Sequence, residues 1–437
     1  MKSAENNKKW NLVIVMVCLL ALPGLVSAQS YLLPPDTLDI FEPATQNGFL
    51  PSARTAAMGG AGIAAGTDGS ALWYNPALLT RIRNFELSAS LSNQRLKDET
   101  SIYGVPTPEA KVNNTRFGGL WAIFPVPTES GGLTLGAAVN RVKSFDRIFR
   151  FASSAAWFNN PLFTTGWGGG EDESGNLWAW SFGGAVEVSP KMSVGLSLDI
   201  FDGSDDYTNF FDSTDVASNY ALHYSKTINS SYTGISGKAG FSYIATNWLT
   251  VAGIVGFPQS NSIDQTVDVI ITDNSRSFPD NFITSYRYTL PFWFGLGAMA
   301  NYRDFTITGD ATYKDFSQLS YRRGQPDLAQ ANQEVMKYYN GVFNYHIGAE
   351  YFIRSAGISL RAGYDLEPIA FKGFPVSHDP HYYTFGVGFL IENAINFDLA
   401  YLTGSWEQTD FTKTNPSLPI LAKYSPNRFL ATVAYRF

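Results

Sequence analysis

The chain of 437 residues has a net charge of -7, 45% hydrophobic residues and a mean hydropathy of -0.09. An acidic chain lacks the basic surface that nucleic-acid binding requires, so no nucleic acid is expected as a partner. The mean hydropathy is too low for a bundle of membrane helices, whereas the length suits a single large barrel.

The first 28 residues have the organisation of a secretory signal peptide. Three lysines precede an apolar run over 11–25, and the small residues 26–28 form a cleavage signal. A retained anchor helix is the alternative, but Pro23 and Gly24 interrupt an already short apolar run. We therefore expect residues 1–28 to be removed, and we exclude them from the fold.

The only cysteine, Cys18, lies in the middle of that apolar run and does not follow a lipobox, which argues against a lipoprotein. The processed chain then contains no cysteine, which excludes disulfides, cysteine-bound zinc and a thiol nucleophile. No later apolar stretch reaches 18 residues. After the signal peptide, membrane insertion must therefore use strands.

Residues 29–84 lack the alternation of strands. The stretch 51–79 is rich in glycine and alanine and nearly uncharged, whereas a free tail would be more polar. Small residues suit a segment that packs closely against other backbone. We predict that 29–84 is an N-terminal extension and plug inside the domain that follows.

Fourteen strand candidates follow, and seven segments of the chain alternate strictly between apolar and polar residues. Alternation with period two indicates strands. A soluble β-sandwich is the alternative, but its outer face would be charged, whereas the second face here is mostly Gly, Ser and Thr with isolated charges. The candidates span roughly 85–95, 115–125, 132–142, 177–188, 191–201, 232–244, 247–258, 287–301, 304–316, 340–353, 356–367, 381–392, 395–407 and 427–437.

The connections between these candidates alternate between short turns and long polar loops without exception. This order predicts an all-β fold over 85–437: a transmembrane up-and-down antiparallel β-barrel of about fourteen strands. An even strand number places both barrel termini on the periplasmic side. One long loop, 317–339, contains good helix formers after Pro326, which predicts a short surface helix over 327–336. The predicted long loops are 96–114, 143–176, 202–231, 259–286, 317–339, 368–380 and 408–426.

The last alternating segment ends on Phe437, the final residue. A terminal aromatic residue on such a strand resembles the C-terminal signature of bacterial outer-membrane proteins. The resemblance implies localisation in the bacterial outer membrane, with membrane lipid and lipopolysaccharide outside the barrel and water or ligand inside it.

The plug region resembles the N-terminal signature of the FadL/TodX family of outer-membrane transporters. The resemblance rests on Ala53-Arg54, the run Met58-Gly59-Gly60-Ala61-Gly62, Asp68, Ser70-Ala71-Leu72 and Tyr74-Asn75-Pro76-Ala77. It implies a fourteen-stranded barrel whose N-terminal hatch carries an Asn-Pro-Ala motif, here Asn75, Pro76 and Ala77, accompanied by Gly59, Gly60 and Gly62.

The same resemblance implies passive uptake of long-chain fatty acids or other hydrophobic small molecules by a monomer without a cofactor. A kink in the third strand, here around Gly136, would open the wall sideways. Two alternatives remain open: a barrel that docks or shuttles secreted proteins, and a structural or adhesive barrel.

A fatty-acid carboxylate would favour a cation in the lumen. The candidate ligand-binding residues are Arg141 and Arg361. Alternatively, either arginine pairs with lumen acids, of which Asp310, Asp398 and Glu350 are the candidates.

Catalysis and metal binding lack a specific motif. No Gly-x-Ser-x-Gly sequence is present, and His346 is predicted to be a lumen polar residue on the same face as Glu350. His378 and His381 flank a proline in a loop, which is a weak metal signal. We therefore predict no enzyme, no catalytic residue, no cofactor and no metal site.

Overall fold

The computed structural model describes residues 50–102, 105–106, 109–153, 165–215, 220–274, 276–324, 328–412 and 415–437. The predicted signal peptide and the first part of the predicted plug, residues 29–49, lie outside the described residues. In the described part, the strands belong to a single antiparallel sheet. They are β1 (Glu86–Ile102), β2 (Val105–Pro106), β3 (Ala110–Val126), β4 (Leu133–Ser144), β5 (Arg147–Ser153), β6 (Thr165–Ser189), β7 (Met192–Asp215), β8 (Tyr220–Thr246), β9 (Leu249–Gly256), β10 (Gln259–Asp273), β11 (Arg276–Leu290), β12 (Trp293–Tyr302), β13 (Phe305–Asp315), β14 (Ser320–Arg323), β15 (Gly341–Ile353), β16 (Ile358–Leu366), β17 (His381–Ile391), β18 (Ile395–Thr412) and β19 (Asn415–Arg436).

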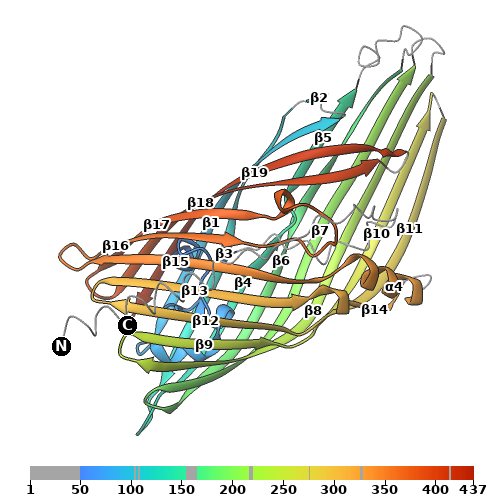
Figure 1. Cartoon of the computed structure of the whole chain (residues 1–437). Helices are drawn as coiled ribbons and strands as arrows, with labels where there is room; N and C mark the ends of the chain where they lie inside the picture. Colours follow the sequence, from blue (N-terminus) through green and yellow to red (C-terminus); the bar gives the residue numbers. More distant parts are fainter. Residues whose placement is uncertain are drawn as a thin grey trace.

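The sheet closes into a barrel because β1 pairs with β3 on one side and with β19 on the other (Figure 1). The described strands occupy fourteen positions around the barrel, each antiparallel to its neighbours, which confirms the predicted fold class. Four positions consist of two consecutive strands: β4 with β5, β9 with β10, β11 with β12, and β13 with β14. A closed sheet excludes the β-sandwich.

In the barrel wall, outward side chains are apolar and exposed, whereas many inward side chains are polar and buried, the reverse of a water-soluble protein. On β7, Leu196 and Leu198 point outward and are 64% and 46% exposed, whereas the inward Ser197 and Asp199 are buried. On β19, Phe429 points outward and Thr432 is buried. Apolar side chains outside and polar side chains inside are the arrangement of a barrel surrounded by lipid.

Short turns join the strands at the end of the barrel where Phe437 lies. In the turn between β17 and β18, Glu392 and Asn393 both have positive φ, as type I′ hairpin turns require. The opposite end carries the longer connections, with η5 (Phe316–Gln318), α4 (Leu328–Tyr338) and η6 (Val376–His378). Helix α4 lies where the short surface helix was predicted.

Helix α4 buries one stripe, formed by Ala331, Val335 and Tyr338 at helical spacing. None of the helices in the described residues is both long and apolar enough to cross a membrane.

The prediction of long polar loops is wrong for much of the chain. Strands β6, β7 and β8 have 25, 24 and 27 residues, far more than the roughly 9–11 that cross a bilayer. Together with β10 and β11 they project beyond the rest of the barrel (Figure 1). Where both faces of a sheet meet water, the apolar alternation disappears, so these paired strands have the composition of loops. Five of the predicted loops are largely strand in their described parts: 96–114, 143–176, 202–231, 259–286 and 408–426.

Candidate functional site

Residues 50–84, here called the inner segment, lie inside the barrel (Figure 1). They form α2 (Ala53–Ala56), α3 (Ala71–Tyr74) and the short 3-10 helix η3 (Pro76–Arg81). Their apolar side chains pack on three separate parts of the wall, so the inner segment crosses the lumen at this level. The contacts join Ala53 and Ala57 to Tyr382 and Leu430, Leu72 and Leu79 to Trp121 and Ala185, and Ile63 and Ala64 to Ala252 and Ile254.

Glycines let the inner segment approach the wall backbone closely. Gly59 has a φ of 66°, and a Cβ added there would lie 2.5 Å from the carbonyl oxygen of Tyr364 and 2.6 Å from that of Ile347. The wall residues facing it, Gly348 and Gly363, are glycines as well, and a Cβ on either would collide with Met58 or Gly59. Backbone therefore meets backbone here without intervening side chains.

The other two predicted glycines meet side chains. A Cβ on Gly60, which has a φ of 80°, would lie 3.1 Å from Cδ2 of His346. A Cβ on Gly62 would collide with the Tyr74 ring.

Asn75 links the inner segment to a different part of the wall. Its Nδ2 donates to the carbonyl oxygens of Ile63 at 2.9 Å and Phe241 at 3.1 Å. Its Oδ1 accepts from the Ala77 backbone N–H at 3.1 Å and so caps η3, with Pro76 at the first helical position. Two wall glycines make room: Gly240 faces Asn75, and Gly195 faces Pro76 and Ala77.

Side-chain hydroxyls of the wall satisfy backbone groups of the inner segment. Thr384 accepts from the Gly59 N–H at 3.0 Å and donates to the Ala57 carbonyl at 3.1 Å. Thr432 accepts from the Ala53 N–H at 2.9 Å. Buried backbone groups must be paired. These hydrogen bonds therefore fix the position of the inner segment along the wall, which apolar packing alone would not do.

Two arginines of the inner segment contact the wall. Arg54 lies 3.3 Å from Glu350 and donates to the Ala65 carbonyl at 2.9 Å. Arg81 donates to the Ala64 carbonyl, within the inner segment, at 2.8 Å and to Ser242 Oγ of β8 at 3.4 Å. Burial, and after it the charge of Arg54, lowers the pKa of Arg81 to about 10, so Arg81 stays charged at neutral pH.

The two predicted ligand-binding arginines lie apart in the lumen. Arg361 contacts Glu350 at 2.5 Å and Asp398 at 2.6 Å, two of the acids considered as its partners. Arg141 is buried and donates to Ser92 Oγ at 2.6 Å and to Asn176 Oδ1 at 3.1 Å. A role for either arginine in ligand binding stays a prediction.

The wall ladder is interrupted beside Arg141. β3 pairs with β4 only from Gly119 to Val126, and the preceding residues of β3 pair with neither β4 nor β5 in the described chain. The register also shifts at Ser90/Leu91, between β1 and β3, and at Arg141/Lys143, between β4 and β6. An ion pair between Arg116 and Asp146, 2.8 Å long, links the two sides of the interruption.

A hydrophobic cluster rich in aromatic residues, here called the outer aromatic cluster, lies at the outer end of the barrel, where α4 and η5 cover the wall. Its buried members include Phe145, Tyr232, Ile263, Tyr288, Phe316, Tyr321, Val335 and Tyr339. The Lys314 Nζ lies 4.8 Å from the centroid of the Phe316 ring, and no carboxylate of the described residues pairs with it.

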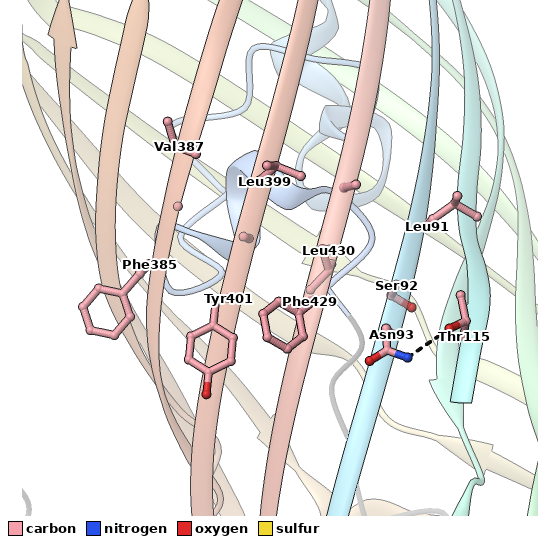
Figure 2. Close-up of a pocket in the computed structure, with 13 residues that line it drawn as sticks. Leu91, Ser92, Asn93, Thr115, Phe385, Val387, Leu399, Tyr401, Phe429 and Leu430 are labelled. Atoms are coloured by element: carbon pink, nitrogen blue, oxygen red, sulfur yellow. Dashed lines mark hydrogen bonds between the residues drawn. The ribbon is translucent and has the colours of Figure 1, made fainter. Parts of the chain in front are cut away.

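A shallow apolar groove of about 540 Å³ lies on the outward face of the wall, across β17, β18, β19, β1 and β3 (Figure 2). Phe385, Tyr401 and Phe429 stand side by side along it, with the inner segment behind the wall (Figure 2). The groove belongs to the apolar outer surface of the barrel and not to a route through its lumen.

Sequence reasoning missed Lys238, and it named Asp310 as a lumen acid without its partner in the inner segment. Lys238 of β8 is buried, pairs with Asp199 at 3.2 Å and lies 3.9 Å from the Trp73 ring centroid. Asp310 of β13 accepts from the Ile63 N–H at 3.0 Å. The available signal was an isolated charge within an alternating strand, but the partner depends on strand register.

No family model matches the chain. A search of curated proteins found no match either. Solved structures nevertheless share its fold. The toluene transporter TodX of P. putida has a TM-score of 0.61 at 13% identity, over 88% of this chain and 97% of that one. A Pseudomonas aeruginosa FadL homologue has 0.61 at 15%, over 89% and 100%. The toluene transporter TbuX of Ralstonia pickettii has 0.58 at 15%, over 90% and 99%.

Proposed function

We propose that this protein is a channel of the bacterial outer membrane for passive uptake of hydrophobic small molecules, such as long-chain fatty acids or hydrocarbons. In this proposal residues 1–28 are a signal peptide, 29–84 an N-terminal extension and hatch, and 85–437 the transmembrane barrel. In the same proposal the protein is a monomer surrounded by lipid and lipopolysaccharide. The TodX and TbuX structures, which share the fold, are described as toluene transporters, which supports a role without catalysis.

The observation that carries this proposal is the inner segment beside an interrupted wall. Because the inner segment crosses the lumen and contacts three parts of the wall, the proposed route does not run straight through the barrel. The ladder between β3 and β4 ends at Gly119, and this interruption provides a weak place in the wall. An apolar solute gains roughly 25 cal/mol per Å² when it leaves water, so a sideways exit into lipid would be favourable.

The outer aromatic cluster suits the substrates named. Aromatic side chains supply large apolar contact areas, which fit hydrocarbons and acyl chains alike. The Lys314 ammonium adds a cation beside the Phe316 ring, where a carboxylate head group would find a partner. Arg361 is a weaker candidate, because two acids already pair with it.

The test is uptake by cells that lack other hydrophobic channels. We expect the full-length protein to raise the initial uptake rates of labelled oleate and labelled toluene several-fold over an empty-vector control. Purified protein should also retain apolar molecules that mass spectrometry identifies. A correctly folded barrel that neither accelerates uptake nor retains an apolar ligand would refute the proposal.

The membrane location has its own test, the substitution Leu198→Arg. Leu198 lies about 20 Å along β7 from the short turn, near the expected bilayer midplane. An arginine facing lipid there is expected to destabilise the barrel by about 2–4 kcal/mol, measured by urea unfolding in lipid vesicles.

The matched control is Ile270→Arg, at an outward apolar residue of β10 that is 42% exposed. Ile270 lies about 70 Å along the strand position that begins at Leu249, beyond the membrane, so the same change should have little effect. Equal destabilisation by both substitutions would argue against this placement of the membrane.

A further inference from the structure

Three ionisable residues stand in one row on the inner face of the wall. Asp310 of β13 is in register with His346 of β15, which is in register with Asp365 of β16. Residues in register on adjacent antiparallel strands have neighbouring side chains. Glu367 follows two residues after Asp365, and its carboxylate joins the same group.

Asp310 orients the His346 ring through its Nδ1 atom. Nδ1 of His346 lies 2.6 Å from Oδ1 of Asp310, and the other Asp310 oxygen accepts from the Ile63 backbone N–H at 3.0 Å. A neutral imidazole that donates from Nδ1 presents a lone pair at Nε2. A histidine that binds a metal through one ring nitrogen often donates from the other to a carboxylate, as His346 can to Asp310.

Two carboxylates lie close to the ring. A ring nitrogen of His346, a carboxylate oxygen of Asp365 and a carboxylate oxygen of Glu367 all lie within 4.8 Å of one another, and Nε2 of His346 lies 3.4 Å from Oδ1 of Asp365. Asp365 is 2% exposed, and its Oδ1 accepts no hydrogen bond within the described chain. A buried carboxylate is costly unless hydrogen bonds or a nearby cation compensate its charge, and here His346 Nε2, 3.4 Å from Oδ1, is the nearby group.

The inner segment contributes a second buried polar group without a hydrogen bond, the Tyr74 hydroxyl. Burial, and after it the charges of Asp68, Asp310, Asp365 and Glu367, raises the pKa of Tyr74 well above its ordinary value. The hydroxyl therefore stays protonated.

We propose that His346, Asp365 and Glu367 bind a divalent transition-metal ion of the Zn²⁺ class, with Asp310 orienting the histidine. One imidazole nitrogen and two carboxylates suit Zn²⁺ and leave its fourth position for another ligand. An imidazole ligand makes Mg²⁺ or Ca²⁺ less suitable. The ion would lie where Gly60 and Ile63 of the inner segment meet the wall, so its binding would stabilise that contact.

The same geometry would also hold a protonated imidazole between Asp310 and Asp365 by ion pairs alone. Arg428 is a further positive group whose charge reaches Asp365, and a bound cation must compete with it. A direct measurement of metal binding distinguishes a bound metal ion from a protonated imidazole.

The experiment titrates ZnCl₂ into folded full-length protein that has been stripped with EDTA, at pH 7.5 against a chromophoric chelator. We expect one Zn²⁺ per chain. His346→Gln and Asp365→Asn should abolish this stoichiometric binding, and Asp310→Asn should weaken it by about 10–100-fold. The control, His223→Gln, removes an exposed histidine 2.7 Å from Asp212 and should change nothing. Heat-modifiable mobility checks the folding of each variant.

The wild type supplies a second measurement that is independent of any variant. Loading it with Co²⁺ should give visible absorption bands of a low-coordinate site with nitrogen and oxygen ligands, which Zn²⁺ abolishes. If the stripped wild type takes up no stoichiometric Zn²⁺, or if folded His346→Gln binds it as tightly, the row is a salt-bridged histidine only and the proposal is wrong.

Discussion

Gly59→Ala is expected to displace the inner segment from the wall while the barrel still folds. The new Cβ would lie 2.5 Å from the Tyr364 oxygen and 2.6 Å from the Ile347 oxygen. Both are ladder carbonyl groups of β15 and β16, so the inner segment moves more easily than the wall. Each 1.4 kcal/mol of strain raises the displaced population about tenfold.

A single cysteine can report this displacement, because the only native cysteine, Cys18, lies in the predicted signal peptide. Ala61→Cys places the reporter at an inner-segment position that is 1% exposed. Maleimide labelling of this reporter should become at least about tenfold faster when Gly59→Ala is added, while heat-modifiable mobility stays normal.

Gly357→Ala is the matched control. Gly357 has the same φ, 66°, but it lies in the short turn between β15 and β16, away from the inner segment. Both substitutions carry a similar backbone cost of about 1–2 kcal/mol, and a Cβ on Gly357 would also lie 2.9 Å from the Leu390 carbonyl oxygen, a collision confined to the turn region. Faster labelling in Gly59→Ala alone therefore reports the contact of Gly59 with the wall. An unchanged labelling rate in Gly59→Ala would contradict the close contact.

The sequence predicts the strands best where one face is lipid-facing and the other is not. Leu196 and Leu198 alternate with Ser197 and Asp199, and the structure has them on opposite faces of β7. A few residues further along β7, Asp205 and Asp206 follow no apolar alternation because the strand has left the membrane region. The backbone of β7 stays paired there, but the amino-acid sequence has no alternation that would indicate it.

Contacts across the lumen depend on register, which the sequence predicts only in part. The pairing of Arg361 with Glu350 and Asp398 could be anticipated, because all three were assigned to inward faces of nearby strands. The row that joins Asp310 and His346 to Asp365 was not recognised, because an inward face does not say which inward residues stand opposite each other, and that depends on strand register. The glycine content of the inner segment indicated close packing, but the facing glycines, such as Gly363, had no separate signal.

Arg361→Met is expected to cause the largest loss of stability among single substitutions in the lumen. Methionine keeps much of the side-chain volume but removes the charge. Glu350 would retain Arg54, 3.3 Å away, whereas Asp398 would have no ion-pair partner in the described chain. An uncompensated buried charge of this kind costs about 3–5 kcal/mol, which urea unfolding in lipid vesicles measures.

Two comparisons isolate the electrostatic part of this effect. Arg354→Met removes an exposed arginine that pairs with Asp304 at the adjacent turn, where solvent screens the pair, so stability should change little. Adding Asp398→Asn to Arg361→Met should restore part of the lost stability, because it removes the charge left alone. If Arg361→Met is as stable as Arg354→Met, the ion pairs of Arg361 contribute no net stability. If instead it selectively reduces uptake of oleate and not of toluene, Arg361 binds the carboxylate of the solute and the structural role assigned to it is wrong.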